Sequence, residues 1–545
     1  MNRITIVFGL MLIASLIFSQ TVVIKGTILG ADGKPLLSAH VHMVSNLPGD
    51  TKVISQTELS AMGNFMLRFN SPALVRLKFT GVNHYSLEIP FLCENTDTIN
   101  FSVKLRAYDI NDPLDNPYVI GDFNNFEVSD DGNIMTKQQD GIFTASVNAV
   151  ADDTLGFQIM GVEKNGLPYT SYEAEKYVYD RSNTYRSVIR TQGGATQVSF
   201  DPSRVLRITS EAVVKFQNDK SLQAKFYAIH KNLLARQDRY QRALNDFVAT
   251  GKPASDYNYD WSKDLSSAKK ARQTEVDATL KNVWLLAAIE YGGMKKDTSL
   301  AVAALTSVSP TSPLWSYFPK LLMQCYDRLS NKSKYLPYVE KIINGHPDQE
   351  IKPLLISQLL DIADAQKDTQ IIISYYQKLV DEFDNTEWLE KAKSKFEPNP
   401  IIKVGGILPE FVVPSIDDTS LIDNKRLAGG YWLINFWATW NSASVKEIDN
   451  ISQVYENYKG KGLNVLSISL DESVEKVTTF RKSKNPMPWL NTFVENSVMS
   501  NLAKQFEVLA LPKIILVGTD GKIVALGDET RGKKLPETLE KALGK

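Results

Sequence analysis

An apolar run at residues 431–437 leads directly into a turn and then into an amphipathic helical pattern that begins near Ser442. The same alternation continues to the end of the chain: strand patterns cover 463–470, 513–517 and 522–526, and helical patterns begin near Ser473, near Ser497 and at Lys534. Strands that alternate with helices build a mixed sheet with helices on both faces. Residues 402–545 are therefore predicted to form an α/β domain.

Four blocks of this C-terminal region carry a family resemblance. They are an entry segment at 405–411, the turn at 436–440, a strand end at 469–472, and a segment with its following hairpin at 506–524. Their order and spacing resemble the thioredoxin superfamily, specifically the exported, AhpC/TSA-like TlpA/ResA thiol-disulfide oxidoreductases. The resemblance implies a thioredoxin-like domain over residues 402–545, with the family's cis-proline at Leu511-Pro512.

The turn lacks the two sulfurs of that family. Where the family pattern reads Phe-Trp-Ala-Thr-Trp-Cys-x-x-Cys, this chain places Asn441 and Ser444 at the cysteine positions. In active relatives a helix N-terminus stabilises the first thiolate, and the second thiol releases the product. Neither side chain here can form a disulfide, so the site is expected to be redox-inactive, with no catalytic residue and no cofactor. Asn441 or Ser442 would instead cap the helix.

A retained acid, Glu447, stands three residues after the second vacant position. It is the one nearby base for Ser442 or Ser444, since residues 347–545 contain no histidine. A serine nucleophile needs an adjacent general base, and a lone glutamate one turn away serves poorly. A serine hydrolase is not expected, and a structural Glu447 is favoured over a functional one.

Trp440, Leu511 and Pro512 are the candidate binding residues. In the resembling family the tryptophan lies beside the catalytic turn and the cis-proline segment pairs with an extended substrate. The three residues would form an apolar shelf able to bind an extended peptide without chemistry. An alternative stays open, in which Trp440 packs against a neighbouring domain of this chain.

The N-terminus has the pattern of an export signal. Arg3 precedes the apolar run Ile4–Phe18, and Ser19 or Gln20 offers a cleavage point. The run is short for a membrane span. Residues 1–19 are predicted to be a signal peptide, so the mature chain is expected in the periplasm or cell envelope, or secreted. No membrane span is expected after signal removal.

Two β-sandwiches are predicted next. Residues 20–107 have strand alternation and Asp-Gly turn chemistry, with Asp32-Gly33 and later Gly63, and resemble carboxypeptidase-regulatory-like modules. Residues 108–202 resemble early-set immunoglobulin-like, glycogen-binding domains through the segment 118–126. Phe126 stands where those sugar binders commonly have tryptophan, so a structural sandwich is the default.

Residues 203–398 switch to helical spacing. No Gly or Pro occurs between Ser203 and Thr250, or between Ala254 and Tyr291, which suits long helices. Pro398-Asn399-Pro400 is predicted to be a linker. The chain is thus expected to be multi-domain: two N-terminal β-sandwiches, a central all-α region and a C-terminal α/β domain.

Composition excludes some functions. With 61 basic and 62 acidic residues, the net charge of −1 gives no reason to expect nucleic acid as a partner. Cys93 and Cys325 are interpreted as buried free thiols, although a disulfide between them stays open. His40 and His42 share a strand face, but no third ligand follows at metal-binding spacing, so no metal is expected.

The leading hypothesis is an exported, redox-inactive thioredoxin-like protein that binds an extended peptide or an envelope protein. One alternative is a thiol-disulfide oxidoreductase or antioxidant protein that uses Cys93 or Cys325. A second alternative is a glycan-binding protein acting through residues 108–202.

Overall fold

A computed structural model describes most of the chain, namely residues 20–36, 38–47, 50, 52–60, 62–71, 73–93, 98–114, 116–127, 133–149, 154–172, 174–180, 184–191, 194–293, 298–384, 386–397, 400–418, 420–495, 500–508 and 511–543. The predicted signal peptide, most of the predicted linker and the expected helix start at Ser497 lie outside these residues. The chain divides into two compact units, Met1–Leu355 and Ile356–Lys545. Each unit is described by itself.

The first unit begins with a sandwich of two four-stranded sheets, ordered β16-β7-β1-β4 and β3-β2-β5-β6. Apolar side chains from both sheets form one core, including Ile24, Leu77 and Phe101. The expected turns are present, since Gly33 and Gly63 both have positive φ angles, of 81° and 73°. The strands are β1 Gln20–Leu29, β2 Ala39–Val44, β3 Val53–Glu58, β4 Asn64–Ser71, β5 Ala73–Gly81, β6 His84–Cys93, β7 Thr98–Lys104 and β16 Val213–Phe216.

Strand β16 corrects the sequence prediction, which placed residues 213–216 in the helical region. Val213–Phe216 pairs antiparallel with β7 and completes the edge of the first sheet. The Phe216 ring lies 5.6 Å from that of Phe101. The segment contains no Gly or Pro and could have formed a helix. It is a strand because it pairs with β7, which lies more than a hundred residues earlier in the chain.

A second sandwich follows in the same unit, with sheets ordered β10-β11-β15 and β13-β14-β12-β8-β9. Phe143 and Phe200 from the smaller sheet meet Phe157 and Ile159 from the larger one in a common core. The strands are β8 Tyr118–Gly121, β9 Asn133–Ile134, β10 Thr136–Lys137, β11 Phe143–Ala149, β12 Thr154–Met160, β13 Lys176–Tyr179, β14 Tyr185–Arg190 and β15 Gly194–Phe200.

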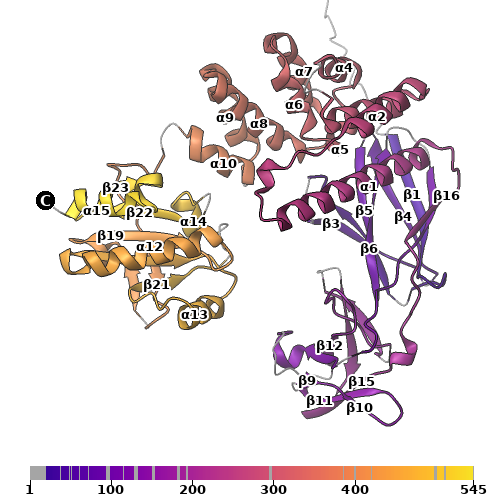
Figure 1. Ribbon diagram of the computed structural model, residues 1–545, viewed down its shortest axis with the longest axis horizontal. Helices are drawn as coiled ribbons and strands as arrows, with labels where there is room; N and C mark the ends of the chain where they lie inside the picture. Colours follow the sequence, from indigo (N-terminus) through magenta and orange to yellow (C-terminus); the bar gives the residue numbers. More distant parts are fainter. Residues whose placement is uncertain are drawn as a thin grey trace, which may run out of the picture. The chain divides into compact units, whose positions relative to one another are not determined.

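Helices occupy the rest of the first unit and the start of the second. Helix α1 packs against β6 of the first sandwich (Figure 1). The expected helix across 254–291 is interrupted, because Asp277 accepts a 2.9 Å hydrogen bond from Leu280 N and begins a new helix. The helices are α1 Leu222–Ala249, α2 Ser262–Thr274, α3 Ala278–Ala288, α4 Ser299–Ser307, α5 Leu314–Tyr317, α6 Leu321–Arg328, α7 Lys332–Gly345, α8 Ile351–Gln366, α9 Thr369–Glu382 and α10 Glu387–Phe396.

The C-terminal domain is built on a five-stranded sheet ordered β21-β20-β19-β22-β23. Strands β20 and β21 run parallel to β19, whereas β22 is antiparallel to it. The elements are β17 Val412–Pro414, β18 Leu421–Asp423, α11 Asn424–Leu427, β19 Tyr431–Trp437, α12 Ser442–Tyr458, β20 Leu463–Ser469, α13 Val474–Ser483, β21 Leu490–Phe493, α14 Asn501–Gln505, β22 Lys513–Val517, β23 Ile523–Leu526 and α15 Lys534–Leu543.

Alternate residues of β19 enter different cores on the two faces of this sheet. Leu433 and Trp437 pack with α12, α13 and α15, and Ile434 and Phe436 pack with α14 and the β17–β18 hairpin. The expected strands at 431–437 and 513–517 and the helix at 534–543 are confirmed. The sheet therefore holds the turn after β19 on a rigid, fully covered central strand. Within the described residues, no helix combines the length and the apolar character that crossing a membrane requires.

Candidate functional site

The turn after β19 is closed by a helix cap. Asn441 has an extended backbone, and its side chain accepts a 2.8 Å hydrogen bond from Ser444 N at the start of α12. Of the two caps expected from the sequence, Asn441 is therefore the one used. The Asn441 side chain therefore has a structural role as the helix cap, and an amide is not a nucleophile.

The position of the second vacant thiol is sealed. Ser444 is 0% exposed, and its Oγ has no hydrogen-bond partner among the described residues. On the sheet beneath α12, both side-chain amide atoms of Asn435 are likewise buried without a partner in the described part of the chain. Solvent does not reach the Ser444 hydroxyl, so it is not available for attack on a ligand.

Glu447 is engaged away from the serines. Its Oε1 accepts from Asn450 Nδ2 at 3.1 Å, and its Oε2 accepts from Gly532 N at 3.2 Å. The first bond lies within α12, and the second links α12 to the loop before α15. The carboxylate is therefore held by donors of the protein, which favours the structural interpretation of Glu447.

Asp471 shapes the turn, and sequence reasoning assigned it no role. Its buried carboxylate accepts from Thr439 N at 3.0 and 3.1 Å, from Thr439 Oγ1 at 2.6 Å and from Ser469 Oγ at 2.8 Å. Strands β19 and β20 are parallel neighbours with Trp437 level with Ser469, so their carboxyl ends meet at one edge. A polar residue just after a buried strand was the available signal.

The candidate binding residues lie at the same edge of the sheet. Phe436 is level with Lys513, so the register carries the turn after Trp437 and the segment Leu511-Pro512 beyond the same sheet edge. Trp440 is 57% exposed, Leu511 is half-buried, Pro512 is buried, and the Leu511-Pro512 peptide is cis.

Two cations flank this edge, and the sequence did not single them out. Arg531 Nη2 donates to the carbonyl oxygen of Pro512, and its Nε is buried without a partner among the described residues. Lys513 Nζ donates to Glu507 O at 2.6 Å, and burial lowers the pKa of this lysine to about 8, opposed by the charge of Glu507. Both side chains therefore brace the backbone around the Leu511-Pro512 segment.

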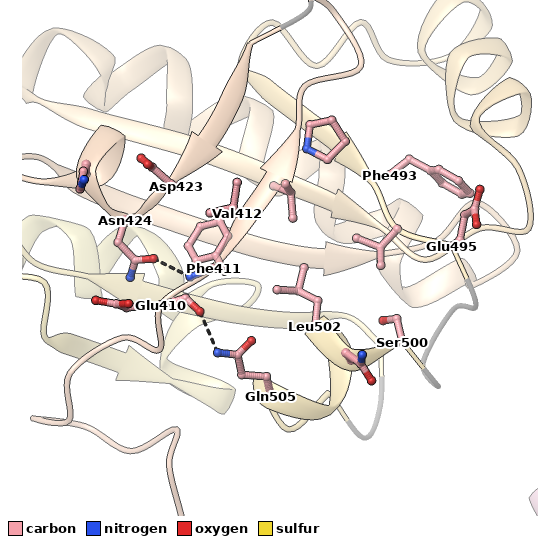
Figure 2. A pocket seen from close by; sticks show the side chains of 15 residues that line it. Glu410, Phe411, Val412, Asp423, Asn424, Phe493, Glu495, Ser500, Leu502 and Gln505 are labelled. Carbon is pink, nitrogen blue, oxygen red and sulfur yellow. Dashed lines mark hydrogen bonds between the residues drawn. The ribbon is translucent and has the colours of Figure 1, made fainter.

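The C-terminal domain also contains a pocket. Its volume is about 1040 Å³, and the β17–β18 hairpin, α14 and the end of β21 form its walls (Figure 2). Asn424 Oδ1 accepts from Phe411 N at 2.7 Å, and Gln505 Nε2 donates to Glu410 O at 2.7 Å. Trp440, Leu511 and Pro512 are not among its lining residues, so the pocket is separate from the turn.

The sugar-binding candidate in the first unit has a covered ring. The guanidinium of Arg186 lies 4.1 Å from the centroid of the Phe126 ring, and Arg186 also approaches Asp122 at 3.8 Å. The guanidinium takes up one face of the ring, which leaves less aromatic surface for stacking on a sugar. This geometry favours the structural interpretation of residues 108–202.

The two histidines of β2 have protein partners. His40 Nδ1 lies 3.0 Å from Tyr185 Oη, and His42 Nε2 lies 3.2 Å from Thr80 Oγ1. Burial first, and then the charges of His40 and Lys78, lower the pKa of His42 to about 4. Within the described ranges, no cluster of three or more potential metal ligands is present.

Comparison with known proteins identifies the C-terminal domain. Residues 429–523 match a family model described as thioredoxin-like. A ResA thiol-disulfide oxidoreductase of Bacillus cereus is 29% identical over 150 residues, covering 28% of this chain and 82% of the relative. That of Bacillus subtilis is 28% identical over 125 residues, covering 23% and 66%.

Two solved structures with similar sequences are also titled thiol-disulfide oxidoreductases. A thiol-disulfide oxidoreductase from Bacteroides fragilis is 29% identical, with 26% of this chain and 98% of that chain covered and a TM-score of 0.23. The thioredoxin domain of a Bacteroides vulgatus thiol-disulfide oxidoreductase is 25% identical, with 26% and 99% covered and a TM-score of 0.24.

The C-terminal domain is therefore a thioredoxin-like domain. Among curated proteins, this domain is similar to the ResA thiol-disulfide oxidoreductases, at 28 to 29% identity in the relatives compared above.

Proposed function

We propose that this chain is an exported thioredoxin-like protein whose C-terminal domain binds an extended peptide or an envelope protein and carries out no redox chemistry. The observation that carries the proposal is the state of the two vacant thiol positions. Asn441 caps α12 and Ser444 is fully buried, while Trp440 beside them stays 57% exposed.

The redox part of the proposal rests on where sulfur lies in the chain. Cys93 and Cys325 are both buried, at 1% and 0% exposure. Burial raises the pKa of both thiols to about 12, so almost no thiolate exists near neutral pH. Both belong to the first compact unit, whereas the thioredoxin-like turn belongs to the second.

The binding part rests on the sheet edge. An exposed tryptophan, a half-buried leucine and a proline at one edge of the sheet provide apolar area of the kind that anchors peptide ligands. Arg531 and Lys513 donate to the backbone carbonyls of Pro512 and Glu507 and so help to hold this edge in place. The fold is preserved around a turn that has lost its chemistry, which favours a surface retained for contact.

The named relatives favour the alternative, a thiol-disulfide oxidoreductase, and one assay separates the two. Purified wild-type protein is expected to reduce insulin no faster than the dithiol reductant alone. Turnover that disappears in a Cys93→Ser/Cys325→Ser variant would establish the alternative instead.

Binding is tested with a thiol-free extended chain, S-carboxymethylated insulin B chain, by isothermal titration calorimetry. Trp440→Ala is expected to weaken binding about tenfold or more, as loss of a central tryptophan anchor does. The matched control is Val412→Ala, because Val412 is 62% exposed in the same domain. Equal affinity in wild type and Trp440→Ala would refute the shelf as the binding surface.

A further inference from the structure

The first unit contains a cavity as well, in a part of the chain that lies outside the matches to the thioredoxin-like relatives. Its volume is about 520 Å³, within the roughly 300–1,000 Å³ typical of ligand sites. One wall is the first sandwich, through β5 and β6. The others are α1, the residue before α2, the segment that follows α3 and the segment around α5. All of these elements belong to the same compact unit.

One side of the cavity is a stacked column of aromatic rings. Tyr240 and Trp261 stack at 5.5 Å, and Trp261 and Tyr291 stack at 5.3 Å. The guanidinium of Arg236 lies 5.1 Å from the Tyr291 ring centroid and pairs with Asp264 at 3.2 Å. This wall is held in place before any ligand arrives, which lowers the entropic cost of binding.

A buried polar atom in the lining lacks a partner. Ser316 is 1% exposed, lies among the residues that line the cavity, and its Oγ has no hydrogen-bond partner in the described part of the chain. An unsatisfied buried hydroxyl is costly in a native structure. A hydrogen-bonding group of a ligand would relieve that cost.

Two residues of opposite charge are also in the lining. Glu290 and Lys320 both line the cavity and have exposed side chains, and neither forms an ion pair with a described residue, although the charge of Lys320 acts on Glu290. By contrast, Arg76 and Glu88 in the sandwich wall already pair at 2.7 Å. Burial raises the pKa of Glu290, and the charge of Lys320 opposes that shift without cancelling it.

We propose that this cavity binds a short zwitterionic peptide with apolar side chains. Its ammonium group would face Glu290, its carboxylate would face Lys320, and its side chains would pack on Leu233, Leu234 and Phe318. A free amino acid carries the same two charges but leaves most of a cavity of this size to water. An uncharged apolar molecule would leave both charged side chains uncompensated as it excluded water from them.

The test is isothermal titration calorimetry of the full chain with tri-leucine. The control ligand is N-acetylated, C-amidated tri-leucine, which has the same side chains without terminal charges. Tri-leucine is expected to bind, and the capped peptide is expected to bind about tenfold more weakly or worse, as when one partner of a charge-assisted hydrogen bond is lost.

Variants of the two charged residues test whether Glu290 and Lys320 bind the charged ends of the peptide. Glu290→Gln and Lys320→Gln are each expected to weaken tri-leucine about tenfold and to leave the capped peptide unchanged. Lys341→Gln, which removes an exposed lysine of α7 outside the cavity, is expected to have no effect. The proposal is overturned if tri-leucine does not bind, if both peptides bind equally, or if both cavity variants bind like wild type.

Discussion

Restoring the two sulfurs should restore thiol chemistry, because the scaffold around the turn is intact. In the double variant Asn441→Cys/Ser444→Cys, the first thiol would sit at the N-terminus of the 17-residue helix α12. The thiol would have Ser444's backbone N–H, now used by the Asn441 cap, as a donor. Asp471 would continue to hold Thr439 and the turn in place.

The stability change should be small, since two effects oppose each other. Loss of the asparagine cap costs about 1 kcal/mol. Replacing the buried, unpartnered Ser444 hydroxyl with a weakly polar thiol recovers about 1 to 3 kcal/mol. The double variant should therefore fold like wild type.

The gain in reactivity follows from the helix N-terminus. A thiol there has a pKa near 7 rather than about 8.5, which raises the thiolate fraction at pH 7 roughly fifteenfold. Thiolate absorbance measured against pH gives the pKa of the new thiol, and insulin reduction gives turnover. The single variant Asn441→Cys, which lacks a resolving thiol, should form mixed disulfides without turnover.

A correctly folded double variant with an ordinary thiol pKa, or with no more turnover than the single variant, would refute this reasoning. It would mean that the geometry of the turn, and not only its sulfurs, has departed from that of a redox site.

Two further predictions concern stability. Asp471→Ala leaves the donors of Thr439 and Ser469 unsatisfied, so the free energy of unfolding measured in urea should fall by about 3 to 5 kcal/mol. The control Glu472→Ala, at an exposed neighbour, should change it by less than about 1 kcal/mol. Similar losses for both variants would contradict the role given to Asp471. The pKa of His42 is about 4 in the folded protein, against an ordinary value of 6.5. Below pH 6.5 the unfolded state therefore binds a proton that the folded state does not. The free energy of unfolding should fall by up to about 3 kcal/mol as the pH drops from 6.5 towards 4. Urea titrations across that range should show a flatter dependence for His42→Gln, and parallel curves would disprove the assignment.

The sequence predicted the elements whose pattern is local. Tyr431–Trp437 and Lys513–Val517 are mostly apolar, with Asn435 and Lys513 as their polar members, and Lys534–Leu543 has an amphipathic period. Each was placed within a residue or two of its observed bounds. The N-cap at Asn441 was also among the residues expected. Local backbone preference and side-chain spacing suffice for such elements.

Elements that depend on distant partners were missed. Leu490–Phe493 is a short strand because β20 lies beside it, and Val213–Phe216 is a strand because β7 offers a free edge. Their own sequences are too short to impose a conformation. In the same way, nothing adjacent to Asp471 in sequence reveals that its carboxylate reaches Thr439, 32 residues earlier.

By itself, the sequence determined that the C-terminal domain has a thioredoxin-like pattern and that its thiol positions hold Asn441 and Ser444, because residue identity and local spacing are properties of the chain alone. Tertiary structure decided that Ser444 is sealed while Trp440 is exposed, that Glu447 is occupied by Asn450 and Gly532, and that a cavity exists beside the first sandwich. Exposure, pairing and enclosed volume arise only when segments far apart in sequence pack together, and local pattern does not encode which segments those are.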